Sequence, residues 1–342
     1  MAEPRDAVAD LQRIAFLLER AHEATYRVRA FRRAAAALSQ LDGAELARRA
    51  TAGTLTELAG VGEVTARCVA ESLAGEEPVY LRRLDATADT PVAEGGAALR
   101  LALRGDCHTH SDWSDGGSPI REMAETARAL GHEYVVLTDH SPRLTVANGL
   151  SADRLRRQLD VVAELNEELA PFRILTGIEV DILDDGRLDQ QPDLLARLDL
   201  VVASVHSGLR MPAEEMTRRM VVAIANPHTD VLGHCTGRMV TGARKRPESQ
   251  FDAELVFAAC ARFGVAVEVN SRPERLDPPK RLLRLAVEAG CRFSVDSDAH
   301  APGQLDWLPY GCARAAACGV PAESVVNTGT AGELLAWTAR HD

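Results

Sequence analysis

Short apolar runs alternate with longer amphipathic segments from Leu101 almost to the end of the chain. The runs have the length of buried strands, and the segments between them repeat apolar residues with the period of a helix. The predicted strands are 134–137, 174–180, 200–205, 231–233, 265–269 and 293–295, and the clearest helices are 120–130, 152–169, 251–263 and 280–289. Such alternation predicts an α/β fold with a mainly parallel sheet that closes into a barrel. An open doubly wound sheet is the alternative, but no GxGxxG motif follows any of these strands.

The beginning of the chain has a purely helical pattern. Leu11, Ile14 and Leu18 lie on one apolar stripe, and a second helix is expected at 26–41. Residues 54–73 indicate two short helices around a Gly-Val-Gly turn, as in compact helical modules. The predicted domains are a small all-helical domain at 1–84, an Ala-, Gly- and Thr-rich linker at 85–104 and the barrel domain at 105–342.

Composition disfavours several classes of protein. The chain has no apolar run that could span a membrane and no apolar signal core near its start, so we expect a cytoplasmic protein. Its seven cysteines form no CxxC pair, which argues against a disulfide framework and against a thiolate zinc site. Nearly all of the net charge of −11 falls in residues 105–342. Because an acidic surface repels polyanions, this charge disfavours tight nucleic-acid binding unless bound cations reverse it locally.

Histidines and carboxylates recur where the predicted strands end. His108 and His110 are two residues apart, so in an extended chain both imidazoles point the same way. The others are Asp115 in a Gly-rich loop, then His140, Glu179, His206, His234, Asp298 and His300 at the ends of later strands. Barrel enzymes assemble their sites at the carboxyl ends of the strands, so we expect these side chains to converge. Any one of them alone would more simply be a hydrogen-bonded core residue, but the whole set indicates a metal site.

Nine such groups exceed what one ion needs, so the set implies two or three divalent ions. Imidazole and carboxylate ligands without thiolate suit Zn, Mn or Fe, in no order that the sequence decides. Cys107 precedes His108 and should point the opposite way, which favours packing over metal binding. The role of Cys235, next to His234, stays open.

The motifs that carry these residues resemble those of the polymerase and histidinol phosphatase (PHP) superfamily. They are HTHSDWSDG, VLTDHS, GIEVDIL, ASVHSGL, GHCTGR, EVNSRPERLD and SDAH, spread over residues 103–330. They are most similar to the PHP domain of bacterial family X DNA polymerases. The resemblance implies a distorted seven-stranded (β/α) barrel with a trinuclear metal site. The ligands that it implies are His108, His110, Asp115, His140, Glu179, His206, His234, Asp298 and His300.

Clustered divalent ions generate hydroxide near neutral pH and stabilise the charge that develops on phosphoryl oxygens. We therefore predict a hydrolase in which metal-bound hydroxide attacks a phosphate ester. Asp298, His206 and Glu179 are the candidates for bridging the ions or supporting the hydroxide. Arg238 and Arg275, just beyond strand ends, could clamp the phosphate as bidentate donors.

Several further residues have weaker assignments. Arg272 and Lys280 are secondary candidates for phosphate binding, and Asp139, next to His140, is a candidate for orienting an imidazole. The remaining histidines, which we expect in solvent, are His22, His132, His228 and His341.

The helical domain also resembles the family X polymerases. AFRRAAAAL (30–38) and LAGVGEVTARCVAESL (58–73) are similar to their eight-kilodalton domain, which carries a helix-hairpin-helix motif. The turn could present the backbone N–H groups of Gly60 and Gly62 to a DNA phosphate, with Arg32 on a basic face, or it could only pack two helices together. Glu63 opposes this, because it lies where the anion would approach. The palm and thumb that separate the two modules in that family do not fit into the linker, so no polymerase activity is expected.

Three functions stay open at this point. The first is a phosphoesterase acting on DNA ends, of the 3′-5′ exonuclease or 3′-phosphatase type. The second is a small-molecule phosphomonoesterase of the histidinol-phosphatase type, and the third is a non-catalytic accessory protein that binds DNA. The complete ligand set argues against the third, and the width of the barrel mouth would separate the first two. The sequence does not predict an oligomeric state.

Overall fold

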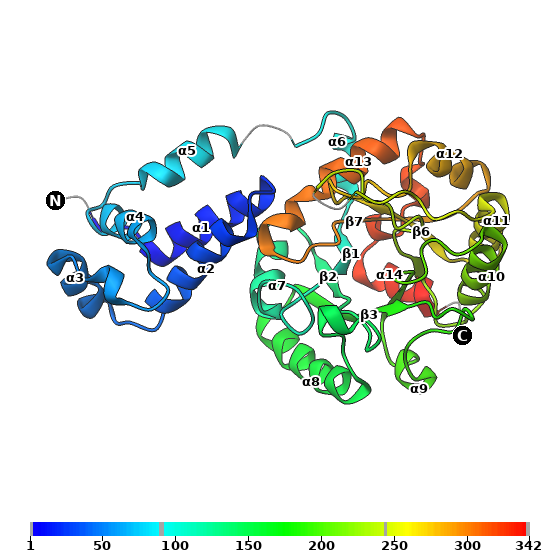
Figure 1. Cartoon of the computed structure of the whole chain (residues 1–342), viewed down its shortest axis with the longest axis horizontal. Helices are drawn as coiled ribbons and strands as arrows, with labels where there is room; N and C mark the ends of the chain where they lie inside the picture. Colours follow the sequence, from blue (N-terminus) through cyan, green and yellow to red (C-terminus); the bar gives the residue numbers. More distant parts are fainter. Residues whose placement is uncertain (1–2, 89–91, 243–244, 340–342) are drawn as a thin grey trace. The chain divides into compact units, whose positions relative to one another are not determined.

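The computed structural model describes residues 3–88, 92–242 and 245–339, and the chain divides into two compact units, 1–91 and 92–342. The first unit is helical and the second alternates strands with helices, as Figure 1 shows. The predicted fold class, an α/β barrel preceded by a small helical domain, is confirmed. The predicted linker contains the end of one helix and the whole of another, and its residues 89–91 lie outside the described ranges.

The first unit packs its helices around one apolar core. The helices are α1 (Ala7–Arg20), α2 (Thr25–Leu38), α3 (Gly43–Ala52), η1 (Leu55–Glu57), α4 (Glu63–Leu73) and α5 (Val79–Ala88). The side chain of Asp6 caps α1 by accepting the N–H groups of Val8 and Ala9. The apolar stripe of α1 is buried against Phe31 and Val69, as its spacing predicts.

The second unit is a seven-stranded parallel sheet in which each strand pairs with the next along the chain. The strands are β1 (Gly105–Thr109), β2 (Tyr134–Leu137), β3 (Arg173–Asp181), β4 (Leu200–Ser204), β5 (Val231–Leu232), β6 (Ala266–Asn270) and β7 (Phe293–Asp296). The helices are α6 (Ala97–Ala102), α7 (Ile120–Ala129), α8 (Ala152–Leu169), α9 (Pro192–Leu195), α10 (Ala213–Ile224), α11 (Ala253–Phe263), α12 (Lys280–Glu288), α13 (Leu308–Ala317) and α14 (Ala331–Thr338). Short 3₁₀ turns are η2 (Thr145–Ala147), η3 (Pro302–Trp307), η4 (Ala322–Ser324) and η5 (Val326–Thr328). This consecutive parallel order excludes the doubly wound alternative, whose strand order reverses.

The seam between β1 and β7 is joined mainly by side chains. The N–H of Cys107 donates to Asp296, and the N–H of Ser297 donates to Asp106. Asn327 bridges both strands by donating its amide to the carbonyls of Gly105 and Val295. A single parallel bridge between Thr109 and Ala299 completes the seam, so the barrel is nearly closed.

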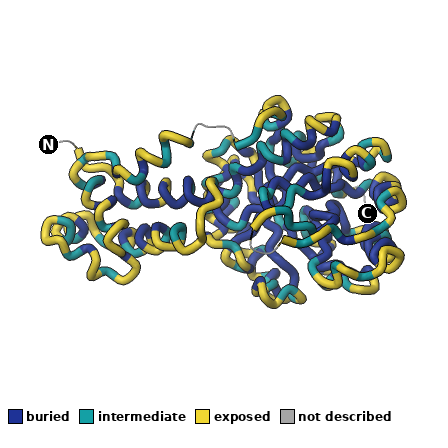
Figure 2. The backbone as a smooth tube through the Cα atoms, turned by 45° about the horizontal axis from the view of Figure 1, so that its top comes forward, coloured by how far each residue is buried: buried dark blue, intermediate teal, exposed yellow. Residues whose placement is uncertain are grey.

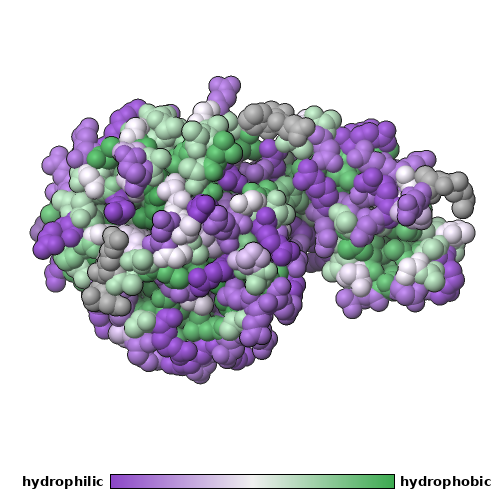
Figure 3. Space-filling model, turned by 180° about the vertical axis from the view of Figure 1, so that it is seen from behind, coloured by the Kyte–Doolittle hydropathy of each residue, from purple (hydrophilic) through white to green (hydrophobic). Residues whose placement is uncertain are grey.

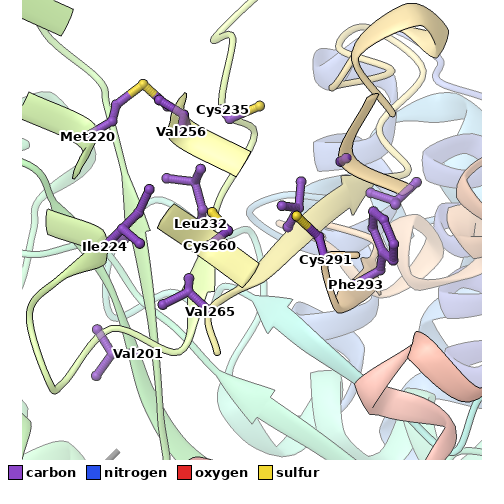
Figure 4. Close-up of a cluster of buried hydrophobic side chains, with 14 of the residues drawn as sticks. Val201, Met220, Ile224, Leu232, Cys235, Val256, Cys260, Val265, Cys291 and Phe293 are labelled. Atoms are coloured by element: carbon purple, nitrogen blue, oxygen red, sulfur yellow. The ribbon is translucent and has the colours of Figure 1, made fainter. Parts of the chain in front are cut away.

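The two faces of the strands enter different cores. Tyr134, Leu200 and Val202 join the cluster that fills the barrel interior, where α14 covers it with Trp337. The alternate residues, such as Val201, pack outward against the helices in a larger cluster, part of which Figure 4 shows. Figure 2 shows the buried backbone at the centre of this unit and exposed segments around it. One end of the interior is therefore apolar, and the polar groups gather at the other.

The structure bears differently on two histidines that the sequence analysis expected in solvent. His132, which follows the end of α7, is buried, only 4% exposed, rather than solvated, because the turn after this helix leads directly into the buried strand β2. His341 lies outside the described residues.

Within the described ranges, each helix is too short or too polar to cross a lipid bilayer. The face of the barrel unit seen in Figure 3 mixes hydrophilic and hydrophobic residues.

Candidate metal centre

All nine side chains that the sequence singled out lie together at the carboxyl ends of the strands. His108 is in β1 and Glu179 is in β3, and the other seven follow β1, β2, β4, β5 or β7 directly or by a short loop. Asp298 adopts a left-handed backbone conformation (φ +52°), which Asp tolerates better than most residues. Such a backbone at a convergent polar site is typical of functional positions.

The carboxylate of Glu179 occupies the centre of the group. Its Oε1 lies 2.8 Å from Nε2 of His234 and 3.2 Å from Nε2 of His206. Its Oε2 lies 2.8 Å from Nδ1 of His140 and 3.3 Å from Nε2 of His108. Since metal ligands sit about 2.0–2.2 Å from an ion, donor atoms at these separations can share one or more ions.

A second carboxylate lies at the outer edge of the group. Oδ1 of Asp115 is 3.4 Å from Nε2 of His140 and 3.4 Å from Nε2 of His300. Deeper in, Oδ1 of Asp298 is 3.5 Å from Nε2 of His110. Asp115 keeps 37% of its side chain exposed, whereas His110 and Asp298 are buried. The group therefore extends from the barrel interior to its mouth.

Three overlapping sets of donor atoms are compact enough to hold an ion. They are His110 with Asp115, His140 and His300; His108 with His110 and Glu179; and His140 with Glu179 and His206. Many of the buried donor atoms have no hydrogen-bond partner among the described residues, namely His108 Nε2, both ring nitrogens of His110, His140 Nδ1, Glu179 Oε2, His206 Nε2 and His234 Nδ1. Burying so many unpaired polar atoms is costly unless a ligand pairs them, so these residues fit divalent cations.

The electrostatics of the site also match a cation-binding role. Burial alone would raise the pKa of Glu179, yet His206 and His108 hold it well below its ordinary value. Burial likewise opposes ionisation of Asp298, and Arg272 is the main group that holds its pKa well below normal. The pKa of His110 is lowered well below normal by burial and by the neighbouring His300. Both carboxylates are thus ionised and His110 is neutral, which are the forms that bind metals. Against the effect of burial, Glu179 raises the pKa of His108 well above its ordinary value and that of His206 to about 9, so these two imidazoles must lose a proton when they bind an ion.

Two buried carboxylates stand behind the imidazoles, and sequence reasoning missed both. Oε1 of Glu268 in β6 lies 2.6 Å from Nδ1 of His108, and Asp181 in β3 makes a short contact with Nδ1 of His206. Both leave Nε2 of the histidine directed at Glu179. The sequence does contain an indication of both residues, in the segments VEV (Glu268) and EVD (Asp181). A carboxylate inside an apolar strand must have a partner when the strand is buried. Carboxylate–histidine pairs of this kind orient metal ligands.

Asp139 does not orient an imidazole, contrary to the sequence interpretation. Its Oδ1 accepts the N–H of Ser111 at 2.8 Å and the hydroxyl of Ser114. Its Oδ2 accepts the hydroxyl of Ser111 at 2.6 Å and the amide of Gln158 at 2.7 Å. Asp139 therefore holds the loop after β1 and the helix α8 rather than an imidazole.

The arginines near the site differ in what they contact. Arg275 Nε lies 3.2 Å from Asp298 Oδ2, and its Nε and Nη1 have no hydrogen-bond partner among the described residues. Arg272 Nη1 donates to His300 Nδ1 at 2.9 Å and lies 3.5 Å from Asp298 Oδ1, closer to the site than the sequence suggested. Arg238 instead donates to the backbone carbonyls of Arg275 and Leu276, which holds the loop that carries Arg275.

The candidate DNA-binding residues of the first unit are mostly engaged within that unit. Gly60 has φ +93°, as a tight turn requires, but the N–H of Gly62 donates to the hydroxyl of Thr65. Both oxygens of Glu19 accept the guanidinium of Arg32, at 2.8 and 3.0 Å. Lys280, a secondary phosphate candidate, is exposed at the start of α12.

Comparison with known families identifies both units. The family described as PHP domain matches residues 106–272, and the family described as helix-hairpin-helix domain matches residues 4–77. The chain belongs to the PHP family of phosphoesterases, and it is a hydrolase, as the sequence predicted. Proteins of this family use divalent metal ions.

The relatives differ in how much of them the chain matches. The DNA polymerase/3′-5′ exonuclease PolX of Bacillus subtilis is 38% identical over 240 residues, which is 70% of this chain but 42% of that protein. A probable phosphatase of Caldanaerobacter subterraneus is 30% identical over 248 residues, 69% of this chain and 90% of that protein. A solved structure of histidinol phosphate phosphatase from Lactococcus lactis, with zinc, L-histidinol and phosphate, has a TM-score of 0.44 and 19% identity over 62% of this chain and 91% of that one.

Proposed function

We propose that this protein is a metal-dependent phosphoesterase that hydrolyses phosphate esters at DNA ends and has no polymerase activity. The observation that carries the proposal is the convergence of nine histidine and carboxylate side chains, six of which have buried donor atoms without a hydrogen-bond partner among the described residues. We further propose that these nine residues hold two or three divalent ions of zinc, manganese or iron. Such ions, when bound, supply an activated water and positive charge for the phosphoryl oxygens.

The chain's own residues account for substrate orientation. The unpartnered N–H groups of Arg275 lie beside Asp298, so they can donate to a phosphoryl oxygen at the metal centre. Arg272 lies over the ring of Trp307, with its Cζ 5.9 Å from the ring centroid, and adds a second fixed positive charge. Hydrolysis forms a bond from the water oxygen to phosphorus and breaks the ester P–O bond, and the alcohol leaves with a proton from water. Glu179, His206 and Asp298 would hold the ions that supply this chemistry.

Two findings favour DNA ends over other phosphate esters. The relative with 38% identity carries a 3′-5′ exonuclease in its name, and the first unit matches a helix-hairpin-helix family. Residues 78–105 separate the two matched families and are too few to form a nucleotidyl-transfer domain, so the proposal omits synthesis. Because this chain covers only 42% of the length of that relative, the other activities of the relative are not proposed for this protein.

A small-molecule phosphomonoesterase is the second candidate. The probable phosphatase from Caldanaerobacter subterraneus is matched over 90% of its length by 248 residues, a length close to that of the barrel unit. Under this alternative the helical unit would not bind the substrate. The engagement of Gly62 and Arg32 within the helical unit is compatible with it.

The test is a substrate series with the full-length protein, loaded in separate samples with Zn²⁺, Mn²⁺ or Fe²⁺. The substrates are single-stranded DNA, a duplex with a recessed 3′-phosphate and p-nitrophenyl phosphate. A duplex with a 3′-hydroxyl separates phosphatase from exonuclease action. We expect the DNA substrates to be cleaved with much higher kcat/KM, and Asp298→Ala to abolish the activity.

The outcomes distinguish the candidates. Efficient hydrolysis of p-nitrophenyl phosphate with inert DNA would replace the first candidate by the second. Turnover by metal-free protein that chelators do not reduce would exclude both.

A further inference from the structure

We infer that Asp139 is a positioning residue that divides the metal centre into a rigid inner part and a separable outer ion position. This inference rests on the metal binding in the proposed function. It concerns the hierarchy among the ions, which neither the ligand set nor the family match specifies.

The inner donors are held by strands and buried carboxylates. His108 and Glu179 belong to β1 and β3, so the backbone hydrogen bonds of the sheet hold them. Glu268 and Asp181 fix the imidazoles of His108 and His206 through Nδ1. These side chains cannot move without disturbing the barrel, so the sites that they form are preorganised.

The outer donor set shares His110 and His140 with the two inner sets and depends on a loop for its carboxylate. Its four members are His110, Asp115, His140 and His300, and Asp115 is its only carboxylate. Asp115 lies in the loop of residues 111–118 between β1 and α7 and is the most exposed of the nine groups. The position of its carboxylate therefore depends on the shape of this loop.

Asp139 determines that shape. Its buried carboxylate accepts hydrogen bonds from Ser111 and Ser114, on both sides of the loop's first turn, and from Gln158 of α8. The N–H of Gly116 then closes the turn on the carbonyl of Ser111 at 2.9 Å. A side chain at residue 116 would meet the backbone of Ser111 at 2.6 Å, so the turn packs too tightly for any residue but Gly.

The same loop is joined to the outer histidine. The N–H of Gly117 donates to the carbonyl of His300 at 2.6 Å, so loop and ligand are held together. Asp139 touches none of the donor atoms of the nine groups through its carboxylate, whose partners are Ser111, Ser114 and Gln158. Its removal should loosen Asp115 while leaving the inner set in place. The outer ion should consequently be the weakest bound and the first to exchange.

The experiment is a Mn²⁺ titration of metal-free full-length protein, in which free Mn²⁺ is measured by its electron paramagnetic resonance signal. We expect wild-type protein to show a tight class of ions and one weaker ion. Asp139→Asn should weaken the second class by about 10- to 100-fold, the usual effect of losing such a supporting group, and leave the tight class unchanged. Ser114→Ala, which removes one of the four bonds, should act in the same direction but less.

Two comparison variants calibrate the result. Asp115→Asn removes the outer ligand itself and should give the same number of tight ions as Asp139→Asn. Glu268→Gln should instead weaken the tight class. In kinetics, the Mn²⁺ concentration for half-maximal activity should rise in Asp139→Asn, while kcat recovers at saturating Mn²⁺. A purely structural defect would not recover in this way.

Several results would overturn the inference. They are a single class of ions in wild-type protein, an Asp139→Asn titration identical to wild type, or a loss that falls on the tight class. If Asp139→Asn does not fold, as its circular dichroism would reveal, the Ser114→Ala titration decides by the same criteria. Two classes of ions that respond as expected, in a protein that hydrolyses none of the substrates, would leave the inference standing and reject the proposed function.

Discussion

Glu268 in β6 and His108 in β1 meet across the barrel, with Oε1 of the carboxylate 2.6 Å from Nδ1 of the imidazole. Both side chains are completely buried. The contact leaves Nε2 of His108 3.3 Å from Glu179 with no hydrogen-bond partner among the described residues. β1 thus supplies the metal-binding Nε2 atom, and the carboxylate from β6 fixes the direction of that atom.

Replacing Glu268 tests this pairing directly. Glu268→Gln keeps the shape of the side chain but removes the negative charge that holds the Nδ1 proton. We expect about 10- to 100-fold weaker binding of the tight ions, because supporting carboxylates have effects of this size. The loss of affinity is measured as the amount of metal that the protein retains after dialysis against increasing concentrations of chelator. Glu323→Gln, at an exposed position in the same unit, is the matched control, and equal retention in the two variants would contradict the prediction.

Removing the ions should destabilise the barrel. The donor atoms without partners are buried, and an ion that binds only the folded state stabilises it by about 2.7 kcal/mol at one hundred times its Kd. For a unit of this size each kcal/mol shifts Tm by about 2–4 °C, so one such ion should raise Tm by about 5–10 °C. Thermal unfolding with and without chelator measures the shift. A Tm that does not respond to metal would argue against binding at this site.

His132 should make the barrel sensitive to acid. Burial, together with the charge of Arg100, lowers the pKa of His132 to about 3. In the unfolded chain its pKa is near 6.5, so between these values the unfolded state binds a proton that the folded state does not. Stability is therefore full above pH 6.5 and falls as the pH drops towards 3. At pH 5 the loss amounts to about 2 kcal/mol, from 1.4 kcal/mol per pH unit below 6.5.

The substitution His132→Leu isolates this effect. Both ring nitrogens of His132 lack a hydrogen-bond partner among the described residues, so leucine removes no bond. We expect the variant to lose about 2 kcal/mol less than wild type between pH 7 and pH 5, as measured by urea unfolding of the metal-free proteins. Because the other histidines titrate in the same way in both proteins, the difference between the two pH profiles reports His132 alone. Parallel pH profiles would show that His132 is solvated when folded.

The sequence predicted the barrel and the convergence of the nine groups because both follow from local patterns. Strand and helix periods specify the alternation, and a strand end specifies where a side chain such as His206 must lie. It did not reveal the partner of Arg238 or of Asp139, because each depends on how one loop packs on another. Glu268 and Asp181 fall between these cases, since a carboxylate in an apolar strand indicates that a partner exists but not which residue it is.

Arg275 and Arg238 should differ in how their loss affects catalysis. Arg275 presents unpartnered N–H groups beside Asp298, and each charged hydrogen bond to phosphate contributes about 1.5–3 kcal/mol. Arg275→Lys keeps a positive charge beside Asp298 but loses the planar pair of guanidinium donors, so kcat/KM should fall by about 10-fold or more while Tm stays unchanged. Arg238→Ala should lower both kcat/KM and Tm, because it releases the carbonyls of Arg275 and Leu276. Steady-state kinetics with thermal unfolding separates them, and a normal Tm for Arg238→Ala would reject the holding role.

In the helical unit, Arg32 and Arg33 should have opposite roles although they are adjacent. Arg32 forms a bidentate pair with Glu19, in which both side chains are largely buried, whereas Arg33 is exposed. Breaking a buried pair by removing one partner costs about 3–5 kcal/mol, so Arg32→Ala should destabilise the helical unit. Arg33→Ala should leave stability unchanged and, if the unit contacts DNA phosphates, weaken binding and reduce the salt dependence by about one counterion. Fluorescence anisotropy of a duplex with a recessed end at several salt concentrations measures the second effect, and circular dichroism melting measures the first. Weaker DNA binding by a stable Arg32→Ala protein, with Arg33→Ala unaffected, would reverse the assignment.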